Sequence, residues 1–340
     1  MFYQQPVLLN YGANLNISNW NVSRAKNMSS MFRGYDTFNG NLMSWDVSNV
    51  EDMSNMFDSA SRFKSPLSKW NVQKVKTMKF MFNEAKSFKS DLSKWNVSSV
   101  ESMNGMFRNA DKFNSDLSNW NVNKVKDMDF MFSRAYRFNS DISKWNVGNL
   151  LVANYMFYGA SDFNSRLENW DTSKVTSMYG MFGYTNFNSD ISRWNVSQVT
   201  DMGQMFDTAT QFNSNIGNWD VSKVNNMMVM FQGAASFNAD ISNWNVGNVF
   251  DMNGMFQLAS SFNIDLSKWN VSQVRYFNKM FNDASNFKQN LCSWNNVAQK
   301  YLEMLTRAQY MFTGTNCPAR HESLNILIVF NPFPFCFQCI

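Results

Sequence analysis

The stretch FNSDISKWNVGNLLVANYMFYGA, residues 138–160, recurs with variations through most of the chain. The neighbouring copy from Phe113, FNSDLSNWNVNKVKDMDFMFSRA, shows the underlying pattern more fully: F-N-x-D-[IL]-S-x-W-N-V-x-x-V-x-x-M-x-x-M-F-x-x-A-x-x, 25 residues long. A fixed period of about 20 to 50 residues is the signature of a repeat architecture and outweighs local propensity as evidence for the fold. The sequence therefore predicts a repeat solenoid.

The 12 tryptophans mark this period. Each lies 25 residues from the next, except for one step of 24 between Trp170 and Trp194. They are Trp20, Trp45, Trp70, Trp95, Trp120, Trp145, Trp170, Trp194, Trp219, Trp244, Trp269 and Trp294. Because stacked repeats contact only their neighbours, we expect the 340 residues to form one array rather than two globular domains.

The spacing of apolar residues within a copy predicts two short elements. Residues 63–72, FKSPLSKWNV, alternate apolar and polar side chains roughly as a short strand and turn would. Farther along, Met, Met-Phe and Ala fall at relative positions 0, 3, 4 and 7, which form one face of an α-helix. In nine copies the residue before the first Met is Asn, Asp, Ser or Thr, which cap helices. We therefore predict an α/β solenoid with one short parallel strand and one short helix per coil, and an all-β solenoid as the alternative.

The two ends of the chain depart from the repeat. We predict an N-terminal extension over residues 1–12, about eleven repeats over 13–291, an irregular capping repeat over 292–318, and a hydrophobic tail outside the fold over 319–340. The insertion Ala298–Arg307 is expected to cover the open end of the solenoid. Cys292 and Cys317 flank the irregular copy, so we predict a disulfide that closes this cap. The N-terminal residues show no legible secretory signal.

Composition gives little support to catalysis or nucleic-acid binding. The formal net charge is +4, with 16% charged residues, far below the basic excess of a dedicated nucleic-acid binder. The single histidine, His321, lies beyond the repeats, so metal clusters and histidine-based catalysis have little to build on. We therefore expect a monomeric, non-enzymatic protein with no catalytic residues, no metal and no cofactor.

Two columns of charged residues are candidates for a binding face. A basic column directly precedes the tryptophans, at Lys69, Lys94, Lys144, Arg193 and Lys268, and an acidic column lies at Asp91, Asp116, Asp141, Asp190, Asp240 and Asp265. Such columns are more often solvated faces than binding sites. A glycosidase needs two carboxylates in unlike environments about 5 to 10 Å apart, whereas this column repeats one environment in every coil. An enzyme that acts on a polymer along the solenoid remains the alternative.

Other repeated residues are expected to serve the core. The Met columns are interpreted as core rather than as a soft-metal site, and the Trp column as a core ladder rather than a sugar-stacking platform. The Asn or Asp after each Trp is predicted to form an internal ladder that satisfies buried backbone. If it does, the N-x-S sequons at Asn21, Asn96, Asn195 and Asn270 cannot be glycosylated in the fold.

The middle of the array is irregular. In the sixth copy Val152 and Ala153 replace the polar residue and the first Met, and the seventh copy is one residue shorter. The same region gathers Tyr155, Tyr158, Tyr179 and Tyr184. An irregularity in a solenoid can mark a binding site, but sequence drift is the simpler interpretation.

The copy FNSDISRWNVSQVTDMGQMF, which begins at Phe187, resembles the 25-residue repeat of the BspA-family leucine-rich-repeat surface proteins, a type also abundant in mycoplasma lipoproteins. The resemblance covers about residues 13–318, and the ending LCSWN…MFTGTNCP is similar to the family's terminal copy. It implies a right-handed leucine-rich-repeat-like solenoid at the cell surface or outside the cell, used in adhesion or recognition of a protein or glycan. It also implies that there are no catalytic residues to carry over. An intracellular scaffold is a further alternative.

Overall fold

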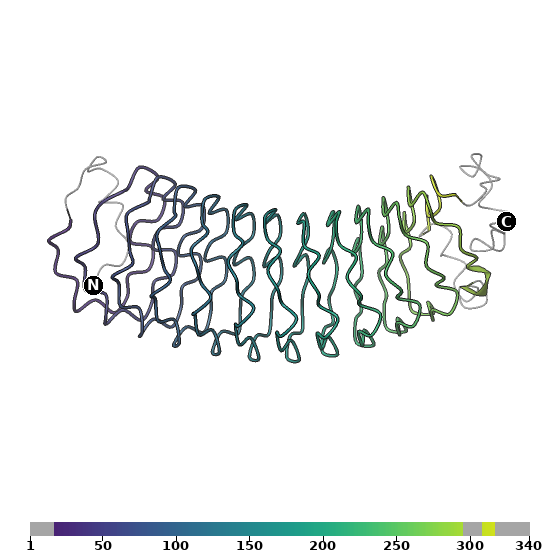
Figure 1. Ribbon diagram of the computed structural model, residues 1–340, viewed down its shortest axis with the longest axis horizontal. Helices are drawn as coiled ribbons and strands as arrows, with labels where there is room; N and C mark the ends of the chain where they lie inside the picture. Colours follow the sequence, from purple (N-terminus) through teal and green to yellow (C-terminus); the bar gives the residue numbers. More distant parts are fainter. Residues whose placement is uncertain (1–16, 295–307, 317–340) are drawn as a thin grey trace. The chain divides into compact units, whose positions relative to one another are not determined.

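The computed structural model describes residues 17–294 and 308–316. The chain divides into unit 1, Met1–Arg166, and unit 2, Leu167–Ile340, which are treated separately below. Within each unit, successive coils of the chain lie side by side (Figure 1). The one helix among the described residues is the 3-10 helix η2, Cys292–Trp294. No helix in this part of the chain has the length and apolar character needed to cross a membrane.

A parallel backbone ladder joins neighbouring coils at the residue before the first Met. In unit 1 the bridges run Asn27–Asp52–Thr77–Ser102–Asp127–Val152, and in unit 2 they run Ser177–Asp201–Asn226–Asp251–Tyr276. From there every second N–H donates to a carbonyl of the next coil, as Met53 does to Thr77 (3.1 Å), Asn55 to Lys79 (2.7 Å), Phe57 to Met81 (2.9 Å) and Ser59 to Asn83 (2.8 Å). These bonds satisfy the backbone of each coil through its neighbour.

The predicted short helix does not form in the described residues. The N–H groups between those of the ladder close tight turns instead, since Met56 donates to the Met53 carbonyl (3.2 Å) and Ala60 to that of Phe57 (3.0 Å). Two residues per coil, the second and the sixth after the first Met, are left-handed; in this coil they are Asn55 (φ 57°) and Ser59 (φ 61°). A left-handed residue interrupts a right-handed helix. Here its own N–H donates to the neighbouring coil, as Asn55 does to Lys79, while the next N–H closes a turn within its own coil. The same spacing of buried residues therefore arises from consecutive turns.

The predicted strand and helix cap also differ from the structure. Residues 63–72 form no strand; they end in a turn in which the Trp70 N–H donates to the Leu67 carbonyl (3.0 Å). The parallel bridges lie in the other half of the coil, at the polar residues that were predicted to cap helices. Asp52 illustrates their role, because its Oδ1 accepts from the Ser54 N–H at 2.8 Å within a turn. The repeat solenoid holds, whereas the predicted elements inside each coil do not.

The tryptophans form buried ladders, as predicted. In unit 1, Trp70 and Trp95 stack with ring centroids 6.4 Å apart, and both are 3% exposed. The indole Nε1 of Trp95 donates to the Leu67 carbonyl at 3.0 Å, so the polar atom of the ring is satisfied inside the core. The ladder of unit 2 repeats this arrangement, with Trp219 and Trp244 also 6.4 Å apart. Trp20, at the edge of the described residues, is an exposed exception.

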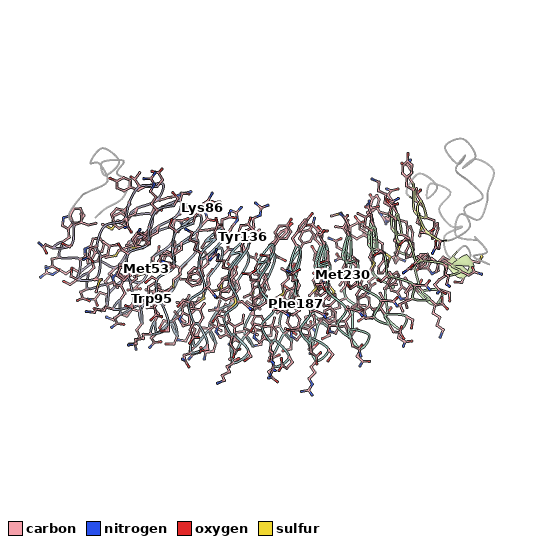
Figure 2. All side chains as sticks on the ribbon, turned by 45° about the horizontal axis from the view of Figure 1, so that its top comes forward. Met53, Lys86, Trp95, Tyr136, Phe187 and Met230 are labelled. Atoms are coloured by element: carbon pink, nitrogen blue, oxygen red, sulfur yellow. The ribbon has the colours of Figure 1, made fainter. Side chains whose placement is uncertain are left out.

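Phenylalanine and methionine fill the rest of the core. Phe57 stacks on Phe63 of its own coil (4.0 Å) and on Phe82 of the next (5.5 Å). The methionines of the two Met columns are buried as well, except for the half-buried Met31 of the first coil, which confirms their interpretation as core. Figure 2 shows Met53 within the body of unit 1, and Tyr136, which is exposed, at its upper margin.

The Asn or Asp after each Trp lies outside the core, so the predicted internal ladder is wrong. All eleven of these residues that the structure describes are exposed. Each caps its own turn; the Ser48 N–H, for example, donates to Asp46 Oδ1 at 3.0 Å. Local Asx turns of this kind need no burial. The sequon residue Asn96 is exposed in the same way and accepts from the Ser98 N–H at 3.1 Å, so burial gives no reason to exclude its glycosylation.

The irregular last copy rejoins the ladder of unit 2. Lys279, Phe281 and Asp283 donate to the carbonyls of Gln309, Met311 and Thr313 at 2.7–2.9 Å. The step from Phe281 to Met311 is 30 residues, compared with 24 from Phe57 to Met81, so the last step of the ladder is six residues longer. Cys292 is disulfide-bonded. Its predicted partner Cys317, the whole insertion Ala298–Arg307, the extension 1–12 and the tail 319–340 lie outside the described residues.

Candidate functional site

The two predicted charged columns lie at the surface. All eleven side chains are exposed: Lys69, Lys94, Lys144, Asp91, Asp116 and Asp141 in unit 1, and Arg193, Lys268, Asp190, Asp240 and Asp265 in unit 2. Each Asp lies three residues before the position of the basic column, and four coils carry both charges within one turn, at Asp91 and Lys94, Asp141 and Lys144, Asp190 and Arg193, and Asp265 and Lys268. The structure therefore spreads these residues along a surface and does not gather them into a centre.

Every carboxylate of the acidic column accepts a hydrogen bond within its own turn. The backbone N–H two residues later donates to Oδ1 over 2.8–3.0 Å in all six cases. These bonds favour the ionised form: the Ser93 backbone N–H lowers the pKa of Asp91, and the Ser143 hydroxyl lowers that of Asp141. A general acid needs the opposite shift. The column has the features of a structural and solvated row.

A second set of aspartates is half-buried beside the ladder. Burial raises the pKa of Asp129, Asp201 and Asp251. The hydrogen bonds that each carboxylate accepts lower its pKa, but burial is the largest single effect on each. Asp127, two residues before Asp129, accepts from the Ser102 hydroxyl (3.0 Å) and lies 3.8 Å from Lys79 Nζ. Within the described residues, no group of three or more His, Cys, Asp and Glu side chains could hold a metal ion.

The backbone ladder carries a different and less regular set of side chains in unit 1. The second position after the first Met (Ala153 in the sixth copy) is left-handed in all six coils of this unit: Ser30, Asn55, Phe80, Gly105, Phe130 and Tyr155. The three aromatic residues have φ values of 52–56°. A left-handed backbone costs an ordinary residue about 1–2 kcal/mol and is uncommon for bulky side chains.

Phe130 and Tyr155 contact each other on the surface, and Phe80 lies against Gly105, the equivalent residue of the coil between Phe80 and Phe130. Phe130 stacks on Tyr155 with centroids 4.9 Å apart, and Tyr155 meets Tyr158 edge-on at 5.4 Å. The guanidinium of Arg108 lies 5.8 Å from the centre of the Phe130 ring. Phe80 leans over Gly105, where an added Cβ would collide with its ring. We call these five residues, Phe80, Arg108, Phe130, Tyr155 and Tyr158, the aromatic strip; all are partly exposed.

Side chains that donate hydrogen bonds and side chains that accept them border the strip. The Asn104 amide donates to Asp127 Oδ1 at 3.1 Å, and Asp129 Oδ1 accepts from the backbone N–H of Asn154 at 2.7 Å. Of the strip itself, only Tyr155 and Tyr158 belong to the irregularity visible in the sequence. Phe80, Arg108 and Phe130 were missed, although a comparison of residue types at equivalent positions of successive copies would have found them.

Family comparison agrees with the repeat. The sequence matches the family described as "Mycoplasma protein of unknown function, DUF285" in four overlapping stretches, residues 1–107, 89–185, 154–241 and 212–317. The chain belongs to this family. The DUF285 matches together cover residues 1–317, and the coils of both described units lie within that range.

Solved structures give distant similarities to this DUF285 protein. A leucine-rich repeat protein from Bacteroides ovatus is 11% identical over 76% of this chain and 75% of its own, with a TM-score of 0.31. The TLR13–ssRNA13 complex (13% identity, 78% of this chain, 46% of that chain, TM-score 0.23) and the Drosophila Toll–Spatzle complex (12%, 85%, 38%, 0.25) also match. No curated protein matches the sequence significantly.

Proposed function

We propose that the chain is a non-enzymatic binding or adhesion solenoid that recognises a protein or a glycan through its long polar surface. The observation that carries the proposal is the repetition itself: equivalent exposed Asp, Asn, Lys and Arg side chains recur from coil to coil. Repeat arrays use such extended surfaces for binding. The similarity to BspA-family proteins supports a right-handed leucine-rich-repeat-like form and a location at the cell surface or outside the cell.

The ionisation of the acidic column also supports this function over a polymer-cleaving enzyme. Glycoside hydrolysis needs one carboxylic acid kept protonated and one ionised partner. Hydrogen bonds within the turns lower the pKa of Asp91, Asp141, Asp190 and Asp240 alike, so these four carboxylates are equivalent bases and none is set apart as an acid.

Binding can be tested with the purified full chain on glycan, protein and cell-surface arrays. We then expect single Asp→Ala substitutions at Asp91, Asp116, Asp141 and Asp190 to weaken binding slightly and to similar extents, because equivalent coils share the contact. Complete loss at one or two of these positions, accompanied by cleavage of a glycan, would favour the enzyme instead. The failure of every array to bind the chain would contradict the proposed function.

The proposed location has its own test. Brief protease treatment of intact cells that express the native protein is expected to remove it while a cytoplasmic marker survives. Complete protection until the cells are lysed would favour the intracellular scaffold.

A further inference from the structure

We infer that the aromatic strip of unit 1 is a docking site for a partner protein that inserts an apolar or aromatic side chain. This inference rests on the proposed function of the chain as a binding solenoid. It selects a protein rather than a glycan as the partner, and it locates the centre of the contact.

The fold itself does not require aromatic residues at the second position after the first Met. Ser30 and Asn55 occupy that position in coils whose ladder is intact, with φ values of 59° and 57°. Phe80, Phe130 and Tyr155 adopt the same left-handed backbone with bulky side chains, and their rings remain partly exposed.

Unfavourable backbone conformations held in place by their surroundings are concentrated at functional sites. Bulky left-handed residues also occur in unit 2, as at Val229 and Leu258, so the backbone conformation alone does not mark a site. Among the regular coils, aromatic residues at the second position are confined to unit 1, and the partly exposed Phe130 and Tyr155 stack on each other there, which indicates selection for what these rings contact outside the chain.

The orientation of the rings favours a protein over a sugar. One face of Phe130 is covered by Tyr155 and the Arg108 guanidinium lies over the ring from the preceding coil, while the ring of Phe80 lies against Gly105. A sugar that stacks on an aromatic ring needs an open face, which Phe130 does not offer because Tyr155 and Arg108 cover it from the two neighbouring coils, so a partner would meet the edge of this ring. Ring edges carry partial positive charge and pack edge-to-face with aromatic side chains. Tyr and Arg are also the residues most enriched at the centres of protein interfaces.

The charges around the strip point to a contact of low net charge. Arg108 and Lys79 are balanced by Asp127 and Asp129, and Lys79 is already 3.8 Å from the Asp127 carboxylate. A nucleic acid would require an excess of basic groups. A partner bound mainly by apolar contacts should therefore bind with little dependence on salt, whereas binding through the Lys and Asp columns should weaken as salt rises.

A phage-displayed random peptide library, selected on the full chain, provides a defined probe. The test variant is Phe80→Asn/Phe130→Asn/Tyr155→Asn, because Asn55 shows that asparagine fits this left-handed position. The matched control is Tyr136→Asn, which removes an exposed aromatic ring of unit 1 outside the strip. We expect selected peptides to contain an aromatic or large aliphatic residue and to bind the triple variant at least about tenfold more weakly than the wild type. Their affinity for the control should be unchanged, and it should vary little with salt.

Melting curves distinguish lost contact from lost fold. If the triple variant melts earlier than the wild type, the single variants Phe80→Asn and Phe130→Asn replace it. The inference is overturned if no peptide prefers the wild type over a folded strip variant, or if a glycan array gives a signal that depends on the strip. If ligands from the arrays above bind the triple variant as tightly as the wild type, the strip is not the docking site and the proposed function stands. If no probe binds the chain at all, both proposals fail.

Discussion

Single residues of the Trp ladder show how much one side chain contributes to a coil. Trp120 is buried, stacks on Trp145 at 6.5 Å and donates to the Leu92 carbonyl at 3.1 Å. Trp120→Ala therefore leaves a large cavity and removes one of the two hydrogen bonds to the Leu92 carbonyl, which also accepts from the Trp95 N–H, and it should destabilise the chain by about 3–5 kcal/mol. The exposed Lys144 is the control, since Lys144→Ala should be nearly neutral. Thermal and urea melts of both variants measure this, and an equal midpoint for wild type and Trp120→Ala would refute the core ladder.

The half-buried Asp251 is expected to make stability depend on pH. Burial raises its pKa, so the folded state disfavours the carboxylate that forms at neutral pH. Asn226 occupies the equivalent place one coil earlier, which shows that an amide fits there. Asp251→Asn should therefore raise the melting temperature at pH 7. The advantage should shrink as pH falls through the raised pKa of Asp251, because the protonated acid no longer carries the buried charge. Melts across pH 3–8 test this, and a variant that is less stable at pH 7 would contradict it.

At the scale of the coil, glycines at the left-handed positions differ in how much stability they contribute. Gly34 (φ 71°) has open space around an added Cβ, whereas at Gly105 (φ 59°) the Cβ would meet the Phe80 ring. Gly34→Ala should therefore cost about 1–2 kcal/mol from backbone conformation alone. Gly105→Ala should cost more, and adding Phe80→Ala should recover the difference. A double-mutant cycle from urea melts measures this coupling. Equal costs for the two glycine variants would mean that the ring moves aside freely.

The same positions explain why the elements of the coil could not be predicted from its sequence. Buried residues at positions 0, 3, 4 and 7 fit a helix, but two left-handed residues per coil produce the same spacing through consecutive turns. Those positions include Asn55, Ser59 and Gly105, and residues of these types are unfavourable inside a helix. They were the evidence in the sequence against the predicted helix. The Asn or Asp after each Trp was also misplaced, because a side chain that caps its own turn recurs as regularly as one that lines a core.

At the scale of the whole molecule, the period was sufficient to predict the solenoid, because each coil is satisfied by its neighbours. The Trp and Met columns identified the core for the same reason. The core of a repeat protein is found from residues that recur in every copy, whereas a localised binding site lies where the copies differ. The charged columns were chosen because they repeat, and the structure gives them no common centre. The aromatic strip interrupts the repeat at Phe80, Phe130 and Tyr155, and contacts between neighbouring coils were needed to see that Arg108, Phe130 and Tyr155 adjoin.

The end of the array provides the last prediction. Residues 308–316 accept the ladder bonds of Lys279, Phe281 and Asp283, and Phe312 stacks on Phe281 at 5.6 Å. A chain truncated after Leu291 would expose these N–H groups and rings, which form an open edge that can pair with another chain. We expect this truncation to aggregate or associate end to end, and a chain ending at Ala319 to remain monomeric. If Cys292 pairs with Cys317, closing that loop adds about 2–4 kcal/mol, so reduction should lower the melting temperature of the longer chain only. Light scattering with and without reductant tests both expectations, and a monodisperse shorter chain would show that the last copy is not needed as a cap.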